Sequence, residues 1–149
     1  TFTPPEREVI NEQTSYLMIN LLQSVVKEGT GIRLRFTYNM ENQIAGKTGT
    51  TQNQSDGWFM GVTPNLVSGV WVGGENRSIH FNSIALGQGA NMALPIWALY
   101  MKQIYNDKSL SNKVSRKDKF EEPLNFNYTL DCEKYDQRHG GGSREDDFF

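Results

Sequence analysis

The sequence predicts an α+β fold in which a three-stranded antiparallel meander is flanked by helices. Apolar residues recur at three- and four-residue spacing near the start of the chain and again after residue 90, as is typical of amphipathic helices. Between these segments lie three runs that are typical of strands, joined by short links that contain turn residues. Short links between consecutive strands favour antiparallel pairing.

The first helix is expected over residues 9–26, and the glycines at positions 29 and 31 are expected to stop it. Residues 32–38 alternate between apolar and polar side chains, which predicts a half-buried strand or extended segment. The three strands of the meander are expected over residues 43–51, 57–63 and 66–73.

A second helix is expected over residues 92–105 after a loop at 75–89. Pro95 is expected in the first turn of this helix, where its missing N–H costs nothing. We place the folded part at residues 1–107. Residues 108–149 are expected to form a polar extension that is largely a disordered tail, because apolar residues become sparse there.

Length and charge exclude several classes of function. The 149 residues match one ordinary domain, and the net charge of -2 is not arranged as the clustered basic surface of a nucleic-acid-binding protein. The single cysteine, Cys132, can form no internal disulfide, and no metal site or cofactor is expected. The chain has no initial Met and no signal peptide, so we expect it to be a fragment of a longer protein.

The residues that are best suited to bind a ligand form the KTGT motif, residues 47–50. Lys47 supplies a cation, and the hydroxyls of Thr48 and Thr50 lie on one face of a strand, where both can donate to an anionic group. Gly49 lets a ligand backbone approach closely. An open strand edge could pair with an extended peptide, and a backbone N–H could stabilise an oxyanion. A K-T-G string alone is weak evidence, since an ordinary strand with exposed threonines would look the same.

Other blocks accompany the motif in a fixed order. They are LQSVVKEGTG at 22–31, AGKTGTT at 45–51, DGWFMGVTP at 56–64, VWVG at 70–73 and ALPIW at 93–97. Over residues 9–105 this set resembles the C-terminal part of the transpeptidase domain of class A penicillin-binding proteins. These are the bifunctional peptidoglycan synthases of the penicillin-binding protein 1A type, which share the penicillin-binding/β-lactamase-like fold.

The resemblance implies serine acyl transfer in cell-wall peptidoglycan synthesis. In this family the serine of an S-x-x-K motif attacks the penultimate D-Ala of a stem peptide, an S-x-N motif assists proton transfer, and the K-T-G strand binds substrate. Carried over by position, Lys47, Thr48, Gly49 and Thr50 are the substrate-binding residues. Lys47 and Thr50 would also support catalysis, Lys47 through electrostatics and the proton network and Thr50 through an oxyanion-hole N–H.

The resemblance also implies partners and a location. The partners are the D-Ala-D-Ala stem peptide, β-lactams and the rest of the parent chain, with no nucleic acid. The parent enzyme would work in the periplasm, at the extracytoplasmic face of the inner membrane, anchored through a segment outside this chain. In the family the strands belong to a five-stranded sheet with helices on both faces, so the isolated chain is expected to expose apolar surface and self-associate.

The catalytic serine of the family is expected to lie outside this chain. The only S-x-x-K string runs from Ser24 to Lys27, in a block where the family has a helix before the substrate-binding strand, so we interpret it as a chance match. No S-x-N triplet occurs. We therefore predict that this chain alone is inactive and that the transpeptidase activity belongs to the parent protein.

Two alternatives stay open. One is a non-catalytic, penicillin-binding-like interaction module, and the other is a fragment of a serine β-lactamase or D,D-carboxypeptidase, although the tryptophan-rich hairpin and the ALPIW block argue against the second.

His80 and His139 are interpreted as histidines without a catalytic role. Trp58, Trp71 and Trp97 are interpreted as core or sheet-face residues, with Trp58 close enough to the motif to line a cleft.

Overall fold

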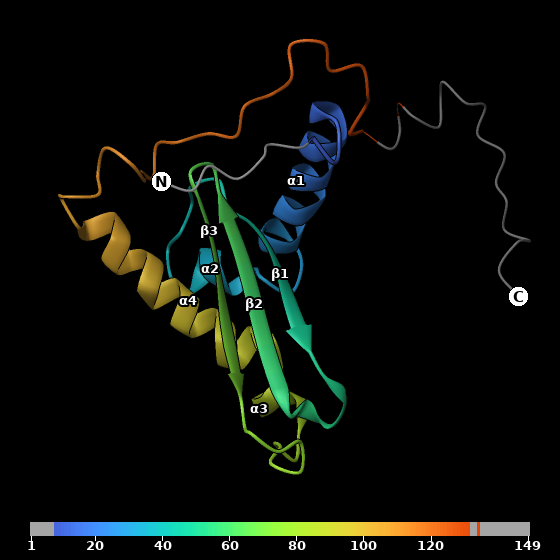
Figure 1. The fold of residues 1–149 in the computed structure, drawn as a ribbon, viewed down its shortest axis with the longest axis vertical. Helices are drawn as coiled ribbons and strands as arrows, with labels where there is room; N and C mark the ends of the chain where they lie inside the picture. Colours follow the sequence, from blue (N-terminus) through green and yellow to red (C-terminus); the bar gives the residue numbers. More distant parts are fainter. Residues whose placement is uncertain (1–7, 132–133, 135–149) are drawn as a thin grey trace, which may run out of the picture.

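A computed structural model describes residues 8–131 and 134. It contains one antiparallel sheet and a set of helices that pack on it (Figure 1). The strands are β1 (Ala45–Thr50), β2 (Asp56–Thr63) and β3 (Leu66–Gly73). The helices are α1 (Glu12–Lys27), α2 (Arg33–Phe36), α3 (Ile84–Gly87), α4 (Gly89–Asn106) and a short 3₁₀ turn, η1 (Gln52–Gln54).

The strands follow the order β1-β2-β3, and both pairs are antiparallel. The predicted α+β class and three-stranded meander are therefore confirmed. In the register, Thr48 lies opposite Phe59 and Lys47 lies opposite Met60. Because opposite residues in a sheet share a face, Phe59 marks the face that the helices cover and Met60 marks the other face.

Helix α1 begins three residues later than the sequence predicts. The side chain of Asn11 caps it by accepting a hydrogen bond from the Thr14 N–H at 2.8 Å. Val9 and Ile10 precede the cap and are exposed. The apolar periodicity could not reveal this start, because it continues across the cap.

The strand predicted over residues 32–38 is wrong, because this segment forms a tight helical turn that includes α2. The Leu34 N–H donates to the Gly31 carbonyl at 3.0 Å and the Arg35 N–H donates to the Ile32 carbonyl at 2.9 Å. Leu34 is fully buried, whereas Phe36 is exposed. Apolar residues two apart mimic a strand, but only one of them reaches the core.

Helix α4 also departs from the prediction. It begins at Gly89, so Pro95 lies inside the helix and not in its first turn. The preceding loop contains the short helix α3. At this earlier start the helix backbone packs directly against the strands. A Cβ on Gly89 would lie 2.4 Å from the carbonyl oxygens of Gly49 and Trp58.

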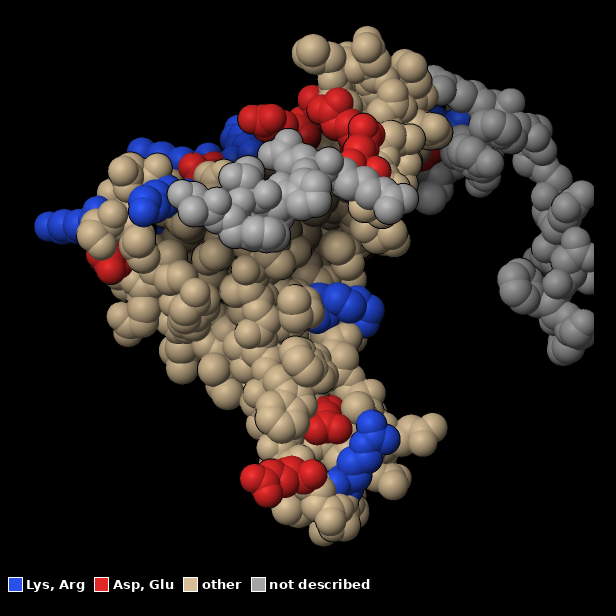
Figure 2. Space-filling view, viewed as in Figure 1, with Lys and Arg blue, Asp and Glu red and all other residues tan. Residues whose placement is uncertain are grey.

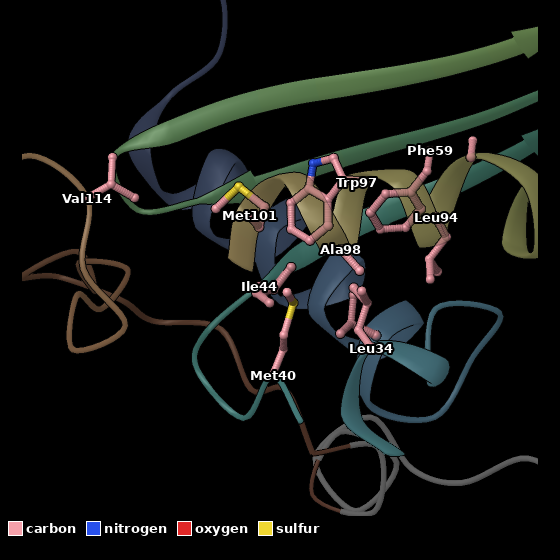
Figure 3. Packing of buried hydrophobic residues seen from close by; sticks show 11 residues of the cluster. Leu34, Met40, Ile44, Phe59, Leu94, Trp97, Ala98, Met101 and Val114 are labelled. Carbon is pink, nitrogen blue, oxygen red and sulfur yellow. The ribbon is translucent and has the colours of Figure 1, made fainter. Parts of the chain in front are cut away.

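The core lies between the sheet and the helices (Figure 3). Phe59 of β2 and Trp97 of α4 are fully buried, with ring centroids 5.1 Å apart in an edge-on contact. The Trp97 indole N–H donates to the Ser68 hydroxyl of β3 at 2.8 Å. Gly61 of β2 makes this arrangement possible, because a Cβ there would lie 2.2 Å from the Trp97 ring.

The extension after α4 makes specific contacts with the rest of the chain. Val114 joins the buried cluster, and the Phe120 N–H donates to the Gln43 side chain at 2.7 Å. Further along, Phe126 packs edge-on against Tyr16 of α1, with ring centroids 5.0 Å apart. The extension thus contacts the segment before β1 and helix α1. Cys132 and His139 lie outside the described residues, as do the other residues of 135–149.

A polar cluster joins this extension to the end of α4. The Asn42 amide donates to the Tyr105 hydroxyl at 2.8 Å, and the Arg116 guanidinium lies 5.0 Å from the centre of the Tyr105 ring. Burial raises the pKa of Tyr105 above its ordinary value of 10.0, and the hydrogen bond from Asn42 and the charge of Arg116 only partly offset this effect.

We predict that Gly61→Ala destabilises the chain by about 1–3 kcal/mol, because the new methyl group must displace the rigid Trp97 indole. Gly69→Ala is the matched control, since its Cβ would meet only the flexible end of Met60 on the open face. Urea unfolding followed by tryptophan fluorescence measures both variants. Equal free energies of unfolding for the two variants would show that the packing of α4 on the sheet does not require a glycine at position 61.

We also predict that Tyr105 makes the fold sensitive to alkaline pH. Its pKa is raised in the folded state, so its contribution is complete below about pH 10 and is lost as the pH rises through the folded value. Thermal melts above pH 9 should therefore show a steeper loss of stability for the natural protein than for Tyr105→Phe, which cannot ionise. Parallel pH profiles would contradict the proposed cause.

Candidate functional site

The KTGT motif occupies β1, at an edge of the sheet. No strand within residues 8–131 pairs with the other side of β1. Figure 1 shows α1 beside the first half of this strand, while the half with the arrowhead extends past the end of the helix. The open part of the edge is therefore the end of β1, toward Thr50.

The backbone of the motif presents hydrogen-bonding groups to this open edge. The Thr51 N–H donates toward β2, to the Asp56 carbonyl, at 3.1 Å. Backbone groups alternate in direction along an antiparallel strand, so the N–H and C=O of Thr50 and Thr48 point away from β2. An extended peptide could pair with these groups.

The charged and hydroxyl side chains of the motif lie on opposite faces of the sheet. Thr48 and Thr50 share the helix-covered face, as the sequence predicts. Lys47 is exposed on the other face, and its ammonium turns back toward the edge, where it donates to the Thr48 carbonyl at 2.7 Å. The cation therefore reaches the edge of β1, whereas the two hydroxyls lie on the helix-covered face.

Both hydroxyls have partners from the helices. The Thr48 and Thr30 hydroxyl oxygens are 2.8 Å apart, and the Gly89 N–H at the start of α4 donates to the Thr50 hydroxyl at 3.0 Å. Since a backbone N–H can only donate, the Thr50 oxygen is the acceptor and its own proton remains available for a ligand. Thr50 is exposed, so a ligand can reach it.

A hydrogen-bonded turn holds the end of β1. The Asp56 N–H donates to the Thr51 hydroxyl at 2.9 Å, and that hydroxyl lies 2.9 Å from the hydroxyl of Ser55. Asn53 and Gln54 adopt left-handed backbone angles, with φ of 58° and 53°. These contacts set where the motif strand stops.

Comparison with known proteins places the chain in a family. The model of the penicillin binding protein transpeptidase domain matches residues 1–78. Penicillin-binding protein 1A of Pseudomonas aeruginosa is 40% identical over 114 residues, and the match covers 74% of this chain and 13% of that protein. The chain belongs to the penicillin-binding protein transpeptidase family.

Two further penicillin-binding proteins of the 1A type support the assignment. That of Aquifex aeolicus is 38% identical over 104 residues, which cover 68% of this chain and 13% of the relative. The crystal structure of penicillin-binding protein 1A from Haemophilus influenzae superposes with a TM-score of 0.59 at 27% identity, over 75% of this chain and 17% of that one. The resemblance to class A penicillin-binding proteins is thus confirmed, and the chain spans about an eighth of the curated relatives.

The S-x-x-K string lies on α1. The Ser24 hydroxyl donates to the Asn20 carbonyl of its own helix at 3.3 Å, a common arrangement for a helical serine. His80 lies exposed in the loop before α3, where its Nδ1 is 3.2 Å from the Phe81 carbonyl oxygen. Neither contact points to an activated nucleophile.

The uncovered face of the sheet is apolar. Trp58 and Trp71 are 44% and 48% exposed, with ring centroids 6.4 Å apart, and Met60 lies on the same face. Trp97, by contrast, is core. Figure 2 shows that charged side chains gather mainly toward the two ends of the visible surface, with few in the middle.

The clearest groove lies elsewhere. A cavity of about 690 Å³ runs between α1 and the tip of the β2–β3 hairpin, and no residue of the motif lines it. In the part of the chain that the structure describes, no group of three or more His, Cys, Asp or Glu could hold a metal ion. None of the helices there is both long and apolar enough to cross a membrane.

Sequence reasoning missed Thr30 and Gly89 as parts of the site. The glycines on either side of Thr30 were interpreted as the stop signal of a helix, and residues 87–89 as a turn or substrate-cleft loop, with no partner in the motif assigned to either. The partners of Thr30 and Gly89 in the motif lie 18 and 39 residues away, so no local pattern could have connected them.

Proposed function

We propose that this chain forms the substrate-binding wall of a serine-type peptidoglycan D,D-transpeptidase, which cross-links stem peptides and also binds penicillin. One observation carries the proposal: in a member of the transpeptidase family, a single edge strand presents an ammonium, two hydroxyls and outward-pointing backbone groups. Such an edge suits an extended peptide that ends in a carboxylate.

Each motif residue has a role in the proposed complex. The hydroxyls of Thr48 and Thr50 donate to the terminal carboxylate of D-Ala-D-Ala or to the carboxylate of a β-lactam. Gly49 has no side chain, so the ligand backbone can come close to the strand. The ammonium of Lys47 adds positive potential at the edge and supports the proton network.

The proposed reaction uses a serine from another part of the longer protein in which this chain resides. Its oxygen attacks the penultimate D-Ala carbonyl, and the oxyanion is held by the serine N–H and the Thr50 N–H. The bond to the terminal D-Ala breaks, and the departing amine takes up the proton that the serine lost. An amine of a second stem peptide then attacks the ester and forms the new amide bond, the ester bond breaks, and the released serine oxygen takes up the proton that the amine loses.

This reaction needs no cofactor or metal. We place the longer protein at the extracytoplasmic face of the inner membrane, where peptidoglycan lies, with its anchor outside these residues. The exposed apolar face, with Trp58 and Trp71 at its centre, supports the expectation that the isolated chain self-associates.

In the longer protein, we predict that Thr50→Val lowers the second-order rate of acylation by a fluorescent penicillin about 10- to 100-fold. The estimate corresponds to losing one hydrogen bond to a charged group. Lys47→Ala should give a loss of similar size. Thr50→Ser keeps the hydroxyl and serves as the matched control. Unchanged rates for Thr50→Val and Lys47→Ala would remove the motif from the binding site.

The chain of residues 1–149 by itself should not become labelled by the same penicillin, because we propose that its nucleophile lies elsewhere. Intact-mass spectrometry detects the acyl adduct, and the longer protein is the positive control. An adduct mapped to Ser24 would show that the S-x-x-K string on α1 is functional. A longer protein that also stays unlabelled would favour the non-catalytic interaction module.

A further inference from the structure

Thr30 is held rigidly beside the motif by the end of α1. It stands between two glycines whose N–H groups donate back to the helix, Gly29 to the Ser24 carbonyl at 3.2 Å and Gly31 to the Val25 carbonyl at 2.9 Å. Cβ atoms on these glycines would lie 3.0 and 3.1 Å from the backbone of Val25, so the turn packs directly on the helix. The place of the Thr30 side chain is therefore set by α1.

The two motif hydroxyls differ in how their protons are directed. Thr50 receives the Gly89 N–H, a group that can only donate, so its proton is always free for a ligand. Thr48 instead faces the hydroxyl of Thr30 at 2.8 Å, and either oxygen of that pair can donate. The direction of the Thr48 proton thus depends on Thr30.

A carboxylate ligand selects one of the two directions. If Thr48 donates to Thr30, its oxygen turns lone pairs toward the anion, which is unfavourable. If Thr30 donates to Thr48, the Thr48 proton is free to bond to the carboxylate, and the chain of two hydrogen bonds polarises in one sense. The helix-side partners then direct both protons to the same place.

We propose that Thr30 is a positioning residue for substrate recognition, which orients the Thr48 hydroxyl toward the carboxylate of the peptide or β-lactam. The inference rests on the proposed function and extends it to a residue outside the motif. The alternative is that the hydrogen bond between Thr30 and Thr48 only stabilises the packing of α1 on β1, as an ordinary tertiary hydrogen bond would.

The test uses the longer protein and compares Thr30→Val, which removes the hydroxyl at nearly constant shape, with Thr30→Ser, which keeps it. Thr37→Val, at another exposed threonine, controls for general effects of the substitution. Each variant is acylated by a penicillin and by the methyl ester of the same penicillin, which lacks the carboxylate charge. Thermal melting reports the stability of each variant.

We expect Thr30→Val to slow acylation by the free acid about 2- to 10-fold, the range for one neutral hydrogen bond, and to leave the slower ester reaction unchanged. Thr30→Ser should restore the natural ratio of acid to ester rates. In a Thr48→Val background, the additional Thr30→Val change should have no further effect, because its target is gone.

Three results would overturn the inference. Equal slowing of the acid and the ester would show that the bond only supports the fold, and natural rates for Thr30→Val would show that Thr48 needs no partner. A Thr30→Val effect that persists in the Thr48→Val background would show that Thr30 acts by another route. If the unmodified longer protein is not acylated at all, the proposed function itself fails, which is a separate outcome.

Discussion

The close approach of α4 to the sheet is the constraint on which the rest of the structure depends. Glycines on both sides allow it: a Cβ on Gly57 would lie 3.2 Å from the Gly89 Cα, and a Cβ on Gly61 would overlap the Trp97 ring. A helix that lies this close buries Phe59 and Trp97 together. The same contact brings the Gly89 N–H within hydrogen-bonding distance of Thr50, so the packing of the core and the geometry of the site have one origin.

The site is consequently an edge and not a pocket. Helices supply hydrogen-bond partners to the motif from one face, and the lysine reaches the edge from the other face. In the function that we propose, this arrangement suits a ligand that lies along a strand, because its backbone can pair while its terminal carboxylate meets the hydroxyls.

The turn after β1 and the turn after α1 both determine the positions of residues in the candidate site. The first uses the hydroxyl of Thr51 and the backbone of Asp56 to end the strand, and the second uses two close-packed glycines to place Thr30. Both are short polar segments next to regular structure. Each turn contacts the motif only because the helices and strands bring the two segments together. The local sequence of the turns therefore does not reveal these contacts.

The sequence by itself determined the class of fold, the family and the residues of the KTGT motif. Alternation of apolar and polar residues, helical spacing and ordered motif blocks are all patterns within short stretches of the chain. It did not determine the conformation of residues 32–38 or the place of Pro95 in α4, since apolar spacing does not say which side chain reaches the core. Only the tertiary structure decided that Thr48 meets Thr30 and that Thr50 meets Gly89. The physical reason is that each hydrogen bond joins segments 18 or 39 residues apart, whose distance in space is set by helix packing on the sheet.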